Sequence, residues 1–211
     1  MKLMFAIGCS LLVCHAFAGE VKLKVSGPDG LDGTATIINK ILEDGSKYVQ
    51  LTMRLKYSDG QVSDVIQESS YDKNGEPVRM LQSTKAGSKK TSIVVTFSAE
   101  GAQVVSDKGD GPKTNMVVRP TTGSTANPTE FWFARTQPKI GETAEYFTFR
   151  VSDQTWIKAK SRFEGQKEVV VDGKRVMGNL VQMGEIKSYS DAVGDPYRIE
   201  LGKLVLERVS K

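Results

Sequence analysis

Two short segments of the chain carry acidic and basic side chains at the same spacing. Residues 72–79 read Asp-Lys-Asn-Gly-Glu-Pro-Val-Arg, and residues 191–198 read Asp-Ala-Val-Gly-Asp-Pro-Tyr-Arg. Aspartate side chains can accept hydrogen bonds from the backbone amides of a turn, glycine supplies a positive φ, and proline can begin a strand where no ladder donor is needed. The shared pattern therefore predicts two similar turns between strands, and one architecture that is used twice.

The four charged residues that end these segments, Asp72, Arg79, Asp191 and Arg198, could also be interpreted as a functional quartet. We favour the structural interpretation, in which the aspartates organise the turns and the arginines cover sheet edges. No motif around them indicates a reaction.

The first residues have the pattern of a cleaved export signal. Lys2 gives a positive start, residues 3–13 are mostly apolar, and residues 16–18 read Ala-Phe-Ala. We expect a signal peptide over residues 1–18 and a single β domain over residues 19–211, located in the periplasm or secreted. The apolar run is shorter than the roughly 20 residues that a membrane span needs, so we expect no transmembrane segment after cleavage.

Removal of that leader would leave little nucleophilic or metal-binding chemistry. Cys9, Cys14 and His15 are the only cysteines and the only histidine in the chain, and all lie before the cleavage site. Lipidation of Cys14 is an alternative, although Leu-Leu-Val before it lacks the usual small residue. Without imidazole or thiol, the mature chain cannot form a Ser-His-Asp or Cys-His site. Ser-Lys dyads and carboxylate pairs stay open, but no motif marks them, so we expect no enzymatic activity.

Metal and nucleic-acid binding are also disfavoured. Asp29, Asp32, Asp107 and Asp110 lie in glycine-rich loops and offer oxygen ligands for calcium, but they lack EF-hand spacing, and turn chemistry explains them better. The formal charge of +4 falls to +3 when residues 1–18, with Lys2 as their one charged residue, are subtracted. Such a small, evenly spread charge does not favour a nucleic-acid partner. We expect no metal and no cofactor.

Most of the chain has the two-residue period of half-buried β-strands. The clearest case is residues 49–57, where Val, Leu, Met, Leu and Tyr alternate with polar residues. Asp172-Gly173 between two β-rich runs is the strongest hairpin signal. Residues 107–127 read mostly as loop. The sequence thus predicts an all-β, predominantly antiparallel fold.

One segment favours a helix instead. Asn127 fits an N-cap and Pro128 the first helical position, and Pro138 limits the helix to about residue 136. A β segment is the alternative. The helix would carry Phe131, Trp132 and Phe133, which could form the lid of a ligand cavity or cover the sheet as core residues.

A resemblance to a known family rests on the two turns and on three further segments. Residues 137–142 (Gln-Pro-Lys-Ile-Gly-Glu), 146–149 (Tyr-Phe-Thr-Phe) and 199–209 are similar to bacterial envelope proteins of the LolA/LolB lipoprotein-carrier type and to related uncharacterised exported domains. The resemblance covers residues 137–209 best. It implies a strongly curved, half-barrel-like antiparallel sheet with a short helix as a lid over an apolar concavity. No specific lipid-handling residue of the carriers can be matched.

The sequence and the resemblance together predict an exported, non-catalytic protein that binds a hydrophobic or acylated ligand. The candidate cavity and lid residues are Phe131, Trp132, Phe133, Tyr146, Phe147 and Phe149. The alternative is a cell-envelope interaction module that binds another envelope protein and fills its concavity with its own side chains. A hydrolase is the third possibility.

Overall fold

The computed structural model describes residues 19–120 and 131–209, so the predicted leader and the predicted helix start at Asn127 lie outside the described residues. The described chain is almost entirely β. Its strands are β1 (Gly19–Ser26), β2 (Asp32–Ile41), β3 (Lys47–Lys56), β4 (Val62–Tyr71), β5 (Pro77–Ala86), β6 (Lys89–Phe97), β7 (Gly101–Asp107), β8 (Pro112–Val118), β9 (Thr143–Arg150), β10 (Thr155–Val171), β11 (Lys174–Met183), β12 (Ile186–Ser190), β13 (Pro196–Leu201) and β14 (Leu204–Arg208); a 3₁₀ turn (η2, Pro28–Gly30) and a short helix (α1, Trp132–Thr136) complete the elements.

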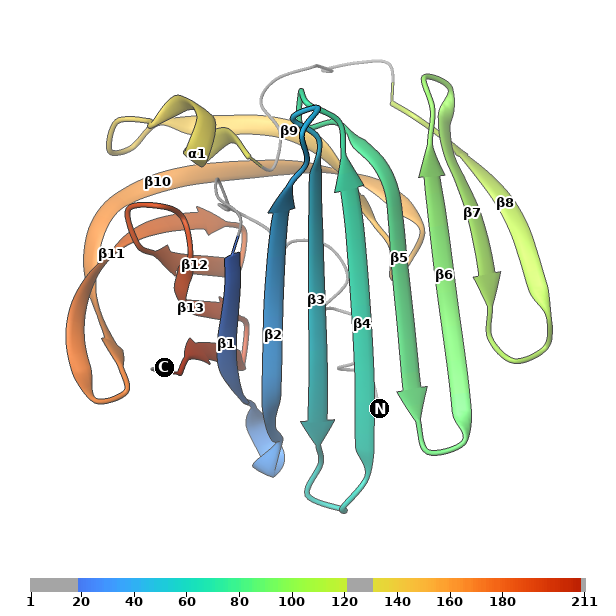
Figure 1. Cartoon of the computed structure of the whole chain (residues 1–211), viewed down its shortest axis with the longest axis horizontal. Helices are drawn as coiled ribbons and strands as arrows, with labels where there is room; N and C mark the ends of the chain where they lie inside the picture. The colour runs from blue at the N-terminus through green and yellow to red at the C-terminus, as the bar shows by residue number, and fades with distance from the viewer. Residues whose placement is uncertain (1–18, 121–130, 210–211) are drawn as a thin grey trace.

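All fourteen strands belong to one antiparallel sheet in the order β8-β7-β6-β5-β4-β3-β2-β1-β14-β13-β12-β11-β10-β9. Two meanders, β2–β8 and β9–β14, therefore meet at β1, which pairs with β2 on one side and with β14 on the other. The sheet bends strongly around its inner face (Figure 1). The predicted curved antiparallel fold with one short helix is confirmed.

Alternating residues of the strands build the core, because successive side chains of a strand point to opposite faces. In β3, Val49, Leu51, Met53 and Leu55 are almost completely buried, while the residues between them contact solvent. Inward-facing residues of β1, β2, β13 and β14 are also apolar and buried, so the inner face of the sheet is one continuous apolar surface.

The two ends of the sheet overlap instead of pairing. Phe149 and Trp156 are cross-strand partners on β9 and β10, on the same face as the exposed Lys158. Both rings pack edge-to-face on Phe97, at 5.6 Å between ring centroids. Phe97 lies on the same face of β6 as the buried Ile93 and Val95, which is the inner face of the sheet. The outer face of one end thus lies against the inner face of the other, as in a scroll. In Figure 1, the far end of β9 and β10 passes behind β5.

Polar contacts complete this overlap. Trp156 Nε1 lies 3.5 Å from the carbonyl oxygen of Val117 on β8, and the guanidinium of Arg119 lies 5.5 Å from the Trp156 ring. Arg119 also forms an ion pair with Glu76, at 2.8 Å. The seam between β8 and the β9–β10 hairpin is therefore held by side chains.

One of the local predictions needs correction. Pro112–Val118 was predicted as loop but forms edge strand β8, whose mostly exposed side chains give no burial alternation. Gly184, at φ +59°, allows the hairpin between β11 and β12. The long strand β10 continues through a β-bulge that Gly165 accommodates. The hairpin at Asp172-Gly173 is confirmed, with positive φ at both residues.

The arginines of the repeated segments do not cover sheet edges. Arg79 on β5 and Arg198 on β13 pair with strands on both sides, whereas the edge strands are β8 and β9. That prediction was wrong, because the turn pattern gives no information on where its strands lie in the sheet.

The overlap makes a clear prediction for stability. Phe149→Ala should lower the free energy of unfolding by about 3–5 kcal/mol, because it removes a fully buried ring from the seam. Phe147→Ala, on the same face of β9 but half-buried, should cost clearly less. Urea denaturation of both variants measures the difference, and equal midpoints for the two would contradict the role of the seam.

Candidate functional site

The first repeated segment forms the predicted turn between β4 and β5. The Oδ1 atom of Asp72 accepts hydrogen bonds from the backbone N–H groups of Asn74 and Glu76, at 2.8 and 2.9 Å. Gly75 has φ +81°, a conformation that strains residues with a Cβ. The predicted role of Asp72 in organising this turn is confirmed.

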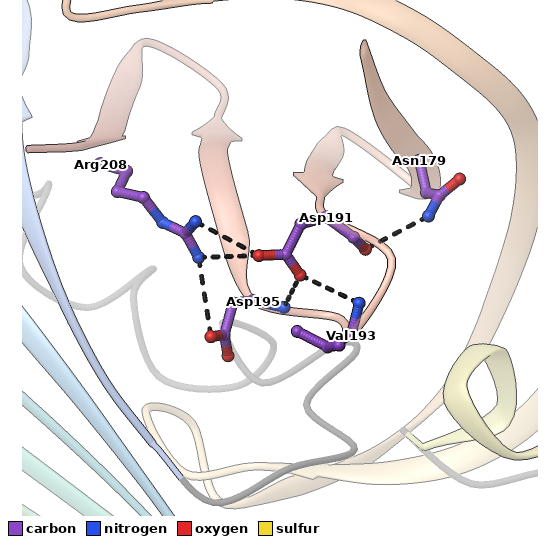
Figure 2. Close-up of polar contacts among 5 residues, drawn as sticks. All are labelled: Asn179, Asp191, Val193, Asp195 and Arg208. Carbon is purple, nitrogen blue, oxygen red and sulfur yellow. Dashed lines mark hydrogen bonds and ion pairs between the residues drawn. The ribbon is translucent and has the colours of Figure 1, made fainter. Parts of the chain in front are cut away.

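The second segment repeats this geometry between β12 and β13. Oδ1 of Asp191 accepts hydrogen bonds from the N–H groups of Val193 and Asp195, at 3.1 and 2.9 Å (Figure 2). Gly194 has φ +93°. Each turn also follows a strand irregularity at the same place, where Tyr71 pairs with Pro77 and Ser190 with Pro196. The predicted reuse of one architecture is confirmed.

An arginine from a later strand attaches to each turn. At the second turn, both terminal nitrogens of Arg208 donate to Oδ2 of Asp191, at 3.2 Å, and one lies 3.7 Å from Asp195 (Figure 2). Arg208 also lies over the Tyr197 ring, as Arg119 lies over Trp156 near the first turn. These arginines fix the turns to the body of the sheet.

Helix α1 contacts the first turn and lies beside the second. Its Arg135 donates a hydrogen bond from Nη1 to the carbonyl oxygen of Asn74 in the first turn. Phe133 and Ala134 face the second turn across a small pocket of about 250 Å³, whose lining includes Val193 and Gly194. The two turns and α1 therefore lie at one end of the curved sheet.

The three aromatic residues predicted for the lid are divided between two hydrophobic clusters, with Phe133 packed against the same cluster as Trp132. Phe131, which precedes the helix, is 1% exposed and packs edge-to-face on Tyr71 in the main core, at 4.8 Å between ring centroids. Trp132 is buried in a second cluster, and Phe133 lies against Phe163 at 5.0 Å. The helix is shorter than predicted and begins at Trp132.

The other three candidates are also divided. Tyr146 joins the second cluster with Trp132, and its hydroxyl lies 2.9 Å from Oγ of Ser161. Phe149 lies in the seam, and Phe147 is half-buried on the charged face of β9. The six candidate residues thus do not line a single surface, and their role in ligand binding stays a prediction.

A larger groove opens beside the first turn, between it and the β2–β3 hairpin tip. It encloses about 870 Å³ and combines apolar Leu42 and Val78 with Lys40, Lys47 and Tyr48, among other residues. Lys40 lies over the Tyr48 ring, at 5.8 Å from its centroid. The groove therefore offers apolar surface beside ammonium groups, a combination suited to an amphiphile.

Lys47 connects this groove to the region beneath α1. Its ammonium lies 4.9 Å from the centroid of the Phe131 ring. Burial lowers the pKa of Lys47, and repulsion from Arg135 lowers it further, while Asp72 acts in the opposite direction. The sequence analysis missed Lys47, because a lysine beside a turn has no distinguishing pattern.

The sequence analysis also missed buried polar residues of the inner face. Asn39, Ser69 and Gln82 occupy inward-facing positions on β2, β4 and β5 and are at most 9% exposed. Asn39 continues the two-residue alternation of the buried Ala35 and Ile37, which places it on the inner face. Isolated polar residues in a strand are common, so this alternation alone does not mark a binding residue.

The weak calcium signal is explained by turn chemistry. Asp107 accepts the N–H of Gly109 at 2.7 Å, and Asp110 pairs with Lys113. Within residues 19–120 and 131–209, no group of three or more His, Cys, Asp or Glu side chains is placed to hold a metal ion. Among these same residues, no helix is long and apolar enough to span a membrane.

No protein-family model matches the sequence, and no curated protein matches it. Among solved structures, the fold is similar to a β-barrel-like protein of the domain of unknown function DUF1849 from Brucella abortus. The TM-score is 0.60 and the identity 12%, with 93% of this chain and 98% of that chain covered. At this identity the similarity establishes the β-barrel-like fold alone.

The two turns should differ in their contribution to stability. Asp72→Ala should cost about 1 kcal/mol and Asp191→Ala about 2 kcal/mol, because Asp191 also binds Arg208 in a half-buried pair. Chemical denaturation of both variants checks the order. Because Gly194 has a positive φ, Gly194→Val should be more damaging than Gly194→Ala. A larger loss for Asp72→Ala than for Asp191→Ala would contradict this account of the Arg208 contacts.

Lys47 should make stability rise with pH. Its folded pKa lies below the ordinary value of 10.5, so the unfolded state binds more protons in the interval between the two values. Below that interval, Lys47 is protonated in both states, and burial of its charge lowers the unfolding free energy by the full amount. This loss of stability disappears as the pH rises through the interval. The unfolding free energy of the wild type, relative to Lys47→Met, should therefore increase as the pH rises toward the ordinary lysine pKa of 10.5. Denaturant titrations along this series measure it, and a constant difference would refute the assignment.

Proposed function

We propose that the protein is an exported, non-catalytic binding protein that holds an apolar or acylated molecule in its curved sheet, beneath α1. The inner face of the described strands is a continuous apolar surface, which supports a hydrophobic ligand. The neighbouring groove with Lys40 and Lys47 supports an amphiphile, since polar and apolar surfaces adjoin there.

The attachment of α1 is the observation that carries this proposal. The helix is only five residues long. Its Arg135 donates a hydrogen bond to the carbonyl oxygen of Asn74 in the first turn, and its Phe133 lies across a small pocket from the second turn. Such an element can move without breaking any ladder hydrogen bond of the sheet. It fits a lid at the end where a ligand would enter.

The resemblance to the LolA/LolB carriers supports the same function at a finer level. Those proteins hold acyl chains in a concavity under a helical lid, and the β-barrel-like neighbour is compatible with such a shape. The absence of a matching lipid-handling residue leaves the cargo of this chain to be identified by experiment.

A second candidate is an envelope interaction module with a self-filled core. The complete burial of Phe131 and Phe149 favours it, because rings that fill a concavity leave less room for a ligand. The two candidates differ in whether the interior can admit an acyl chain.

The two tryptophans provide the test. Trp132 lies in α1 and Trp156 in the seam, so ligand entry beneath the helix should change the emission of Trp132 and leave that of Trp156 unchanged. The variants Trp156→Phe and Trp132→Phe, each with one tryptophan, are titrated with fatty acids of increasing length. Affinity should rise about tenfold for each two CH₂ groups, from about 0.8 kcal/mol per buried CH₂.

Native mass spectrometry of the protein from its own host provides an independent check, because a retained ligand adds mass. A flat titration at every chain length, in folded protein shown to be free of ligand, would reject the carrier and leave the interaction module.

A further inference from the structure

Among residues 19–120 and 131–209, four buried side chains of the sheet carry polar atoms that have no hydrogen-bond partner. Both side-chain atoms of Asn39, the hydroxyls of Ser69 and Ser190, and Oε1 of Gln82 are buried and unpaired. Asn39 is 5% exposed, and Ser69 and Ser190 at most 1%. More than nine in ten buried polar groups in proteins are paired, so such a set requires an explanation.

The strand register brings three of these residues together on the inner face. Asn39 on β2 pairs with Val49 on β3, which pairs with Ser69 on β4, so Asn39 and Ser69 share one row across the sheet. Gln82 on β5 lies one row deeper, in the row that contains Leu51. We use the name inner polar row for Asn39 and Ser69 together with Gln82 in the adjacent row.

The inner polar row lies directly beneath the lid. The next row toward the rim contains Lys47 and Tyr71, which are cross-strand partners. Tyr71 packs against Phe131, and Lys47 lies over the same ring. Ser190 occupies the position of Tyr71 in the second copy of the turn architecture, and so lies at the same end of the sheet.

The position beside Asn39 on the β1 side carries no side chain, because the cross-strand partner there is Gly19. The partner on β3 is the buried Val49. A group bound next to the Asn39 amide would therefore not have to displace a side chain of β1.

An uncharged polar group suits these residues. The amide of Asn39 offers donors and acceptors, the hydroxyl of Ser69 offers both, and Gln82 Oε1 accepts. Most side chains around them in the same rows, including Val49, Leu51 and Met80, are apolar and buried, and the buried amide of Gln67 lies between Leu51 and Gln82. An ion there would lose its hydration, and the nearest ammonium in the adjacent row, that of Lys47, lies over the Phe131 ring. Ester carbonyls and hydroxyls would gain hydrogen-bond partners at a smaller desolvation cost.

We propose that the inner polar row is the binding site for the uncharged head of an acylated ligand, of the acylglycerol class, with its chain along the apolar rows deeper in the sheet. This proposal rests on the carrier function proposed above and adds the chemistry of the ligand. Without such a ligand, apolar residues at these positions would give a more stable protein, because burial of an unpaired amide is unfavourable.

The test compares an acylglycerol with a hydrocarbon of similar chain length. Wild type, Asn39→Leu, Ser69→Ala and the matched control Asn115→Leu, on exposed edge strand β8, are titrated with monododecanoylglycerol and with dodecane by displacement of the uncharged fluorophore N-phenyl-1-naphthylamine. Asn39→Leu should weaken monododecanoylglycerol binding about tenfold, the loss of about 1.4 kcal/mol expected for a buried hydrogen-bonding group. Dodecane binding should change less than about twofold, and Asn115→Leu should alter neither.

Thermal denaturation of the same ligand-free variants separates the remaining possibilities. Asn39→Leu should raise the melting temperature while it lowers acylglycerol affinity; Ser69→Ala, the smaller change, should do the same to a lesser degree. If both ligands bind the variants as they bind the wild type, water satisfies the inner polar row and this proposal is wrong, while the carrier function stands. If neither ligand nor the fluorophore binds wild-type protein, both proposals are rejected.

Discussion

The architecture depends on the packing of Phe149 and Trp156 against Phe97. A sheet of fourteen strands has two free edges, and here the ends overlap face to face instead of joining by hydrogen bonds. Because the overlap is made by side chains, the curvature of the sheet is set by where aromatic rings can be buried. Arg119 adds to this constraint, since it links the overlap to the first turn through Glu76.

Local patterns allowed much of the fold to be predicted. The alternation in residues 49–57, the hairpin at Asp172-Gly173 and both Asp-x-x-Gly turns depend on nearest neighbours, and the structure confirms them. The strand order, the overlap and edge strand β8 depend on contacts between distant segments. No short-range pattern contains that information. Because the side chains of β8 are nearly all exposed, its sequence also lacks the alternation of polar and apolar residues that predicts a strand.

The site was predicted only in part, for a related reason. The helix that Pro138 was predicted to end at about residue 136 is present over Trp132–Thr136, but the sequence could not show that adjacent Phe131 and Trp132 enter separate clusters. Asn39 and Lys47 escaped notice because their environment arises from strand register, which places them beside Gly19 and Phe131. The polar chemistry beneath α1 is thus a property of the assembled sheet.

The pairing of β1 with β14 has a consequence for how the chain reaches its final form. Leu23 and Arg208 are partners, and Val209 donates a hydrogen bond to Lys22, so the first described strand is completed by the last. Ribosomes deliver residues from the N-terminus onward, and contacts between such distant segments form slowly. Until synthesis is nearly finished, β1 keeps one unsatisfied edge beside the growing β2–β8 meander. The nascent chain therefore carries an exposed edge that can pair wrongly or recruit a chaperone, and the order of translation, more than any single residue, sets how long that risk lasts.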